Sequence, residues 1–120
     1  MSDLPAKAYK VLAAEQMAVL LAEGTFAGAS IDLVDGYIHL STAEQLAETV
    51  SKHFAGQSGL HIAAVELTQL GDAVRWEPSR GGQLFPHIYG PLPYSAVIAH
   101  GPLERDKQGA FCLPDAGPVP

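Results

Sequence analysis

Cysteine and positive charge are both scarce in this sequence. Cys112 is the single cysteine in 120 residues, so no internal disulfide can form, which suits a reducing compartment. Seven Lys and Arg stand against thirteen Asp and Glu, and the net charge is −6. The basic residues are scattered along the chain. Because nucleic-acid-binding proteins usually present a basic stripe or patch, we expect no nucleic-acid partner.

Long apolar runs are missing as well. The longest one, residues 17–22, is far too short to cross a bilayer. The first residues lack the basic region and the apolar run of a signal peptide. These absences predict a cytoplasmic protein without a membrane partner, and they leave the oligomeric state open.

Several motifs of common functional sites do not occur. No pair of residues has metal-ligand spacing such as His-x-x-x-His or Cys-x-x-Cys, so we expect no metal. Gly-x-Ser-x-Gly, the Walker motif and the dinucleotide motif Gly-x-Gly-x-x-Gly are also absent. Cys112 stands among Phe111, Leu113 and Pro114, where an inert, half-buried thiol is expected rather than a nucleophile.

The composition that remains is typical of one globular domain. Of the residues, 48% are apolar and 17% are charged, and a chain of this length can bury a sizeable core. We expect a single domain over residues 1–120, with a core over about 8–103 and a partly irregular tail over 104–120.

Periodicity predicts two helices and several short strands. A helix is expected over 14–23 and a second over 41 to about 54; a loop is expected over 25–34. Strands are expected over 8–12, 37–40, 60–67, 73–77 and 96–99, and a compact aromatic loop over 85–89. Without a regular βαβ cycle, this order indicates a compact α+β fold with a split, mostly antiparallel sheet.

The segment from Tyr37 to Thr42 is the first candidate site. Its alternation places Tyr37 and His39 on one face of a strand, and Ser41 and Glu44 have the form of a capping box for the next helix. A histidine beside free backbone N–H groups suits a ribose hydroxyl, a phosphate or a carboxamide. The alternative, which a lone histidine favours, is a core residue next to an ordinary helix cap.

The segment Arg75-Trp76-Glu77 is the second candidate. In a strand, Trp76 faces away from Arg75 and Glu77, which share the other face. Glu77 then belongs to a site, with Trp76 as a wall or stacking surface. Equally, Trp76 is a core anchor and Arg75–Glu77 is a solvated ion pair of little energetic value.

The segment from Phe85 to Pro91 is the third candidate. Two prolines restrict its backbone and Gly90 permits a tight turn, so the segment is suited to fixing His87 and Tyr89 in place. If it is extended, these two side chains share a face. A structural loop with a packed Tyr89 is the alternative.

At these segments the chain resembles a small bacterial family catalogued as domain of unknown function 952. The matching pieces are residues 35–41, Gln45, residues 75–77 and residues 85–92, and the similarity extends from about Tyr9 to Pro114. The resemblance implies a remote relation to the ADP-ribosyltransferase-like fold, which binds nicotinamide adenine dinucleotide (NAD) in a cleft of a split sheet.

That relation implies roles for individual residues. His39 corresponds to the residue that binds a ribose hydroxyl, with Ser41 or Thr42 nearby. Tyr89 or Trp76 corresponds to the aromatic residue that stacks on nicotinamide. Glu77 precedes Tyr89 and so departs from the usual order of the acidic residue, whereas Glu104 has that order but stands in a polar tail.

Three hypotheses follow. The first is an NAD-using transferase or glycohydrolase with Glu77, His87 and His39 as catalytic residues. The second is a module that binds a nucleotide-like small molecule without chemistry. The third is a purely structural network of His, Tyr and Glu side chains. The ligand-binding residues common to the first two are His39, Ser41, Thr42, Arg75, Trp76, Phe85, His87 and Tyr89.

Overall fold

A computed structural model describes residues 5–115, apart from the side chain of Arg80. These residues form three α-helices, α1 (Ala14–Glu23), α2 (Ser30–Asp35) and α3 (Leu46–His53). The strands are β1 (Lys7–Leu12), β2 (Thr25–Phe26), β3 (Ile38–His39), β4 (His61–Glu66), β5 (Val74–Pro78), β6 (Leu84–Ile88), β7 (Leu92–Pro93) and β8 (Val97–Pro102). No helix among the described residues is long and apolar enough to cross a membrane.

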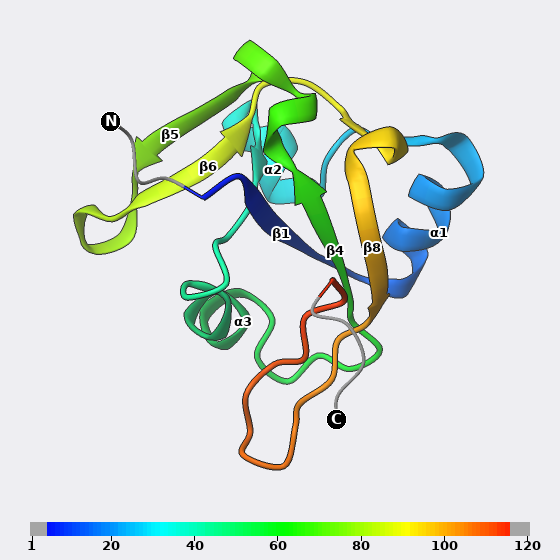
Figure 1. Ribbon diagram of the computed structural model, residues 1–120, viewed down its shortest axis with the longest axis vertical. Helices are drawn as coiled ribbons and strands as arrows, with labels where there is room; N and C mark the ends of the chain where they lie inside the picture. Colours follow the sequence, from blue (N-terminus) through cyan, green and yellow to red (C-terminus); the bar gives the residue numbers. More distant parts are fainter. Residues whose placement is uncertain (1–4, 116–120) are drawn as a thin grey trace.

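The strands form three small antiparallel sheets. Their orders are β1-β4-β8, β3-β6-β5 and β2-β7. In Figure 1, the β5–β6 hairpin lies to the left of β1 and β4, whereas α1 lies to the right of β8. The expectation of an α+β fold with mostly antiparallel sheets is confirmed.

The core lies on both faces of the β1-β4-β8 sheet. On β4, Ala63 and Val65 belong to one apolar cluster, and Ile62 and Ala64 belong to the other. Helix α1 contributes Leu20 to the first cluster. The second cluster is covered by α3 and by the C-terminal segment, through Leu46, Val50, Phe111 and Leu113. Because β4 is buried on both faces, it reads as a continuous apolar run, as the sequence predicts.

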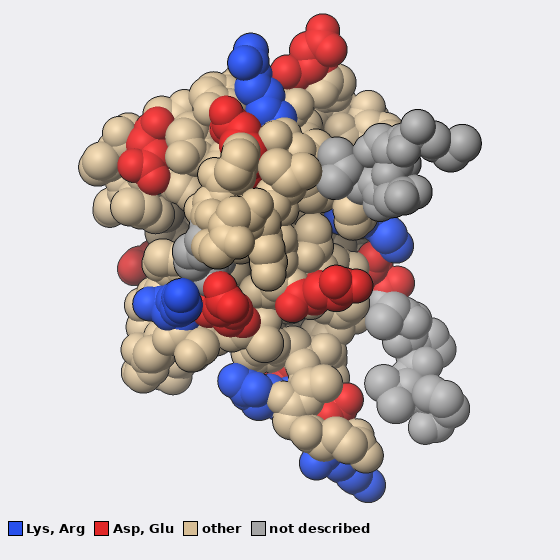
Figure 2. All heavy atoms as spheres, turned by 90° about the vertical axis from the view of Figure 1, so that its left-hand side faces the viewer, with Lys and Arg blue, Asp and Glu red and all other residues tan. Residues whose placement is uncertain are grey.

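Charged side chains are interspersed over the face of the molecule that carries the β5–β6 hairpin (Figure 2). Acidic and basic groups both occur there, some of them side by side, and most of the surface around them is uncharged. The described part of the C-terminal segment turns back on itself, with a bridge between Arg105 and Phe111. Asp115 then binds Tyr9 Oη at 3.0 Å and Lys7 Nζ at 2.8 Å. The rest of the tail expected to be irregular, residues 116–120, lies outside the described residues.

Two segments predicted as loops have regular secondary structure. Residues 25–34 contain β2 and most of α2 instead of a loop, so there are three helices and not two. Helix α2 has six residues and depends on a tertiary contact of Asp32, which no periodicity reveals. Residues 85–88 are strand β6 instead of a loop. The carbonyl of Pro86 accepts a hydrogen bond from Leu40 N at 3.1 Å, just beyond the end of β3. The nitrogen of Pro86 points to the same side, where β3 has ended, so the missing N–H leaves no strand partner unpaired.

Helix α3 begins at Leu46 instead of residue 41, and the reciprocal bonds predicted for Ser41 and Glu44 are made one residue later, in the turn before the helix. Gln45 N donates to Thr42 Oγ1 at 3.2 Å, and Thr42 N donates to Gln45 Oε1 at 3.0 Å. Ser41 is still extended, since it pairs with Tyr9 in an isolated bridge. Its hydroxyl lies 2.6 Å from Thr49 Oγ1. The predicted Ser41–Glu44 box is therefore wrong, and Thr42 and Gln45 make the reciprocal bonds.

Replacing Gln45 with alanine tests this assignment. The change removes the bond to Thr42 N and a second bond, 2.8 Å long, from Gln45 Nε2 to Leu84 O. We expect the free energy of unfolding in urea to fall by about 0.5–2 kcal/mol, the range for lost helix caps. Glu44→Ala is the matched control and should be nearly neutral. If Glu44→Ala lowered the free energy of unfolding more than Gln45→Ala, the reciprocal bonds would belong to Ser41 and Glu44 as the sequence predicts.

Candidate functional site

The β3-β6-β5 sheet has one apolar face and one polar face. Ile38, Ile88 and Trp76 pack against the first core cluster. His39, His87 and Glu77 lie on the opposite face, because the side chains of a strand alternate. Three predictions are thereby confirmed: Tyr37 shares a face with His39, Tyr89 shares one with His87, and Trp76 faces away from Arg75 and Glu77.

Asp32 of α2 organises one half of the polar face. Its Oδ2 accepts from Ala29 N at 2.7 Å, the backbone N–H that begins the helix. Its Oδ1 accepts from His39 N at 3.0 Å and lies 2.6 Å from His39 Nδ1. Burial raises the pKa of the Asp32 carboxyl, but bonds from His39 and Ala29 and the charge of Lys10 outweigh it, so the pKa lies well below its ordinary value.

Lys10 of β1 completes this buried group. Its ammonium contacts Asp32 Oδ2 at 3.0 Å, Asp32 Oδ1 at 3.3 Å and His39 O at 3.0 Å. Three acceptors match the three N–H donors of a lysine ammonium. Burial lowers the pKa of Lys10, and the charge of Asp32 opposes that change. Sequence analysis missed both residues, although a lysine inside an apolar alternating strand is a visible signal for a buried partner.

The position of Asp32 requires a glycine at residue 28. Gly28 has φ +128°, and a Cβ there would lie 2.9 Å from Asp32 Cβ. We expect Gly28→Ala to lower the free energy of unfolding by about 1–3 kcal/mol, through backbone strain and displacement of Asp32. Gly109→Ala is the control, since Gly109 also has positive φ but no heavy atom within 4 Å of the added Cβ. Thermal melting of both variants checks the difference.

His39 is held between two carboxylates. Its Nδ1 lies 2.6 Å from Asp32 Oδ1 and its Nε2 lies 2.9 Å from Asp35 Oδ2. Because a carboxylate lies against each ring nitrogen, neither nitrogen of His39 is open to a ligand.

His87 has a different environment. Its Nδ1 lies 2.8 Å from Glu77 Oε1, and the same oxygen accepts from Tyr89 Oη at 2.7 Å. Hydrogen bonds from His87 and Tyr89 lower the pKa of Glu77, and the bond to Glu77 raises the pKa of Tyr89. No described residue forms a hydrogen bond with His87 Nε2. Every fully buried side-chain nitrogen or oxygen of the described residues has a hydrogen-bond partner. His87 Nε2 is therefore not fully buried, although the side chain of His87 is only 4% exposed.

Tyr37 joins the two histidines. Its ring stacks on His87 with centroids 4.2 Å apart and lies 4.8 Å from His39. Burial, with the charges of Asp35 and Glu77, raises the pKa of Tyr37. Arg75 lies over the ring of Tyr89 at 5.2 Å, instead of in the predicted pair with Glu77.

A cavity of about 270 Å³ opens in front of the two histidines. Four of the predicted ligand-binding residues line it: His39, Ser41, Phe85 and His87. The sequence did not indicate Lys10, Asp35 or three of the rings in its wall, those of Tyr9, His53 and Phe54. The rings that line it are Tyr9, Tyr37, His39, His53, Phe54, Phe85 and His87.

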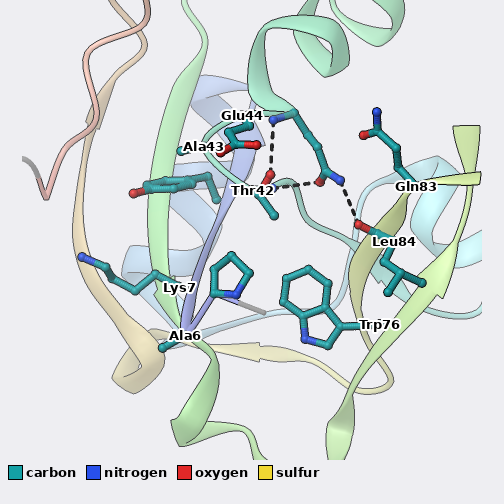
Figure 3. A pocket seen from close by; sticks show the side chains of 11 residues that line it. Ala6, Lys7, Thr42, Ala43, Glu44, Trp76, Gln83 and Leu84 are labelled. Atoms are coloured by element: carbon teal, nitrogen blue, oxygen red, sulfur yellow. Dashed lines mark hydrogen bonds between the residues drawn. The ribbon is translucent and has the colours of Figure 1, made fainter. Parts of the chain in front are cut away.

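The remaining predicted residues lie elsewhere. Thr42 and Trp76 line a second, more open hollow of about 630 Å³, between the first residues of β1, the turn before α3 and the β5–β6 hairpin (Figure 3). Arg75, Glu77 and Tyr89 line neither hollow, and Glu77 meets His87 at Nδ1. The backbone alternation explains this division, since Ser41 and Phe85 open to one hollow and their neighbours Thr42 and Leu84 to the other.

Comparisons with known proteins give a family and a fold. A family model described as "Protein of unknown function (DUF952)" matches residues 11–100. No curated protein matches the chain. The crystal structure of protein CC0527 from Caulobacter crescentus is similar with 44% identity and a TM-score of 0.80, covering 91% of this chain and 96% of that one. Its solution structure has 42% identity and a TM-score of 0.74, covering 92% and 93%.

Proposed function

The chain belongs to the DUF952 family of proteins of unknown function, and we propose that it binds a small ring-containing molecule in the cavity in front of His87. The observation that carries the proposal is that His87, whose Nδ1 is bound to Glu77, lines a cavity in which seven of the fifteen lining residues carry rings. Small-molecule pockets typically combine apolar and aromatic walls with a few fixed polar groups.

The size of the cavity limits the ligand. About 270 Å³ lies just below the usual range for drug-sized ligands. The part of the ligand that enters is therefore one ring or two fused rings. His87 Nε2 accepts a hydrogen bond from it, whereas the carboxylate of Asp35 is already bound to His39.

A narrower proposal adds the ADP-ribosyltransferase-like relationship and NAD. The buried part of the ligand is then the ribose or the nicotinamide of the dinucleotide, and the protein is a transferase or glycohydrolase. The cavity suits one such part, and the remainder of the molecule extends from the opening. In this arrangement Glu77 acts through His87 and not by direct contact with the ribose.

Binding experiments test both levels of the proposal. We expect NAD, ADP-ribose, ribose 5-phosphate or nicotinamide to raise the melting temperature and to shift the imidazole NMR signals of His87. At the same ligand concentration His87→Gln should show a much smaller rise in melting temperature, whereas Trp76→Leu in the second hollow should preserve the rise. If Trp76→Leu is the variant that loses binding, the site is the second hollow, and if no compound binds, the proposal fails.

Release of nicotinamide from NAD separates an enzyme from a binding module. An enzyme releases nicotinamide, and Glu77→Gln lowers the rate with little change in affinity. A binding module retains roughly its affinity in Glu77→Gln and releases no nicotinamide. Turnover by wild type that is unchanged in Glu77→Gln would remove Glu77 from the mechanism.

A further inference from the structure

We infer that His87 is a general base whose Nε2 removes a proton from an O–H or N–H group on the bound ring, and that Glu77 is the positioning residue that fixes its tautomer. This inference rests on the proposed ligand site. It names the class of substrate, a planar ring with an acidic hydroxyl or imide-type N–H, and the first chemical step.

The tautomer follows from the contacts of Glu77. An ionised carboxylate accepts hydrogen bonds and donates none, so the 2.8 Å contact between His87 Nδ1 and Glu77 Oε1 requires the proton on Nδ1. In a neutral imidazole the other nitrogen then carries a lone pair. His87 lines the cavity, whereas Glu77, which binds Nδ1, does not, so we place Nε2 on the cavity side of the ring.

Neighbouring groups hold Glu77 in this role. The hydroxyl of Tyr89 donates to the same oxygen at 2.7 Å, and the guanidinium of Arg75 lies over the Tyr89 ring at 5.2 Å. The lowered pKa of Glu77, caused first by its bond with His87, keeps the carboxylate ionised. A base oriented by a carboxylate at its second ring nitrogen is the arrangement that also stabilises the imidazolium formed after proton transfer.

His39 differs from His87 in a way that assigns the roles. Both nitrogens of His39 contact carboxylates, so neither is open to a ligand. Its ring centroid lies 5.3 Å from that of His87, and both rings line the cavity. His87, whose Nδ1 alone has a carboxylate partner, is therefore the histidine to which we assign the base role.

The proposed step conserves protons and charge. The X–H bond of the ligand breaks, its electron pair stays on X, and the proton bonds to His87 Nε2. The products are a ligand anion and a His87 imidazolium, whose charge is balanced by Glu77. The step needs no oxidant, reductant or further reactant.

Long-range ¹H–¹⁵N NMR of protein labelled at histidine tests the tautomer without a ligand. We expect the neutral His87 ring to carry its proton on Nδ1 in wild type, with the His87→Gln spectrum as the assignment control. Glu77→Gln should populate the other tautomer, because its amide donates as well as accepts. A wild-type ring with its proton on Nε2 overturns the inference, whatever binds.

A chromophoric phenol then tests the proton transfer. 4-Nitrophenol is to be added about one unit below its ordinary pKa, where most of the free compound is neutral and colourless. We expect the bound compound to turn yellow and the bound ionised fraction to fall about tenfold in Glu77→Gln. Binding by NMR without the colour overturns the base role and leaves the ligand site standing. If neither this phenol nor the compounds above bind, both proposals fail together.

Discussion

Asp32→Asn is expected to be the most destabilising single substitution considered for this protein, lowering the free energy of unfolding by about 3–5 kcal/mol. Asp32 is 2% exposed and its carboxylate contacts the buried ammonium of Lys10. Asparagine leaves that ammonium without its counter-charge and replaces one acceptor oxygen with a donor. Urea unfolding followed by circular dichroism measures the loss.

Asp35→Asn is the matched control for this prediction. Asp35 also binds His39 and stands on the same short helix, but its side chain is 36% exposed. Exposed ion pairs contribute about 0–1 kcal/mol, so this variant should remain close to wild type. Equal losses in the two variants would show that the contact with His39, and not the burial of Lys10 and Asp32, provides the stability.

The lowered pKa of Asp32 determines how the stability of the protein depends on pH. The pKa of Asp32 is lowered in the folded protein, so as the pH falls below the ordinary value of 3.8 the unfolded chain binds a proton at this residue before the folded protein does. The stability that Asp32 contributes is thus present above that value and is lost as the pH falls towards the lowered pKa. In acid, the stability of wild type should fall more steeply than that of Asp32→Asn.

The polar face of the sheet was predictable from the sequence because it depends on local alternation. His39 with Tyr37, and His87 with Tyr89, need only a spacing of two in an extended chain. The same rule places Trp76 against the core. It predicts which side chains share a face and does not predict which residues of other elements meet them.

The partners that give the two histidines different roles were not predictable. Asp32 and Asp35 lie on α2, a helix too short to have a periodic pattern, and Lys10 reaches Asp32 across 22 positions of the sequence. These contacts come from the packing of α2 and β1 against β3. The sequence made both histidines catalytic candidates, with a core role as the alternative that a lone His39 favours, and only the tertiary contacts show that both nitrogens of His39 are bound to carboxylates.

His87→Gln is expected to weaken ligand binding by about 10- to 100-fold, or about 1.4–2.8 kcal/mol. The glutamine approximates the imidazole in length and polarity, but its flexible amide does not hold a lone pair at the position of Nε2. Isothermal titration with whichever probe binds wild type measures the change.

The stability of the same variant decides between a ligand site and a structural network. In a network that exists for stability, the loss of His87 leaves buried partners unpaired at about 1–3 kcal/mol. Here Tyr89 is 41% exposed and the side chain of Glu77 is 35% exposed, so water can replace the bonds that His87 made with them. We therefore expect His87→Gln to change affinity more than unfolding free energy. A variant that melts much earlier yet binds its ligand as wild type does would make the network structural.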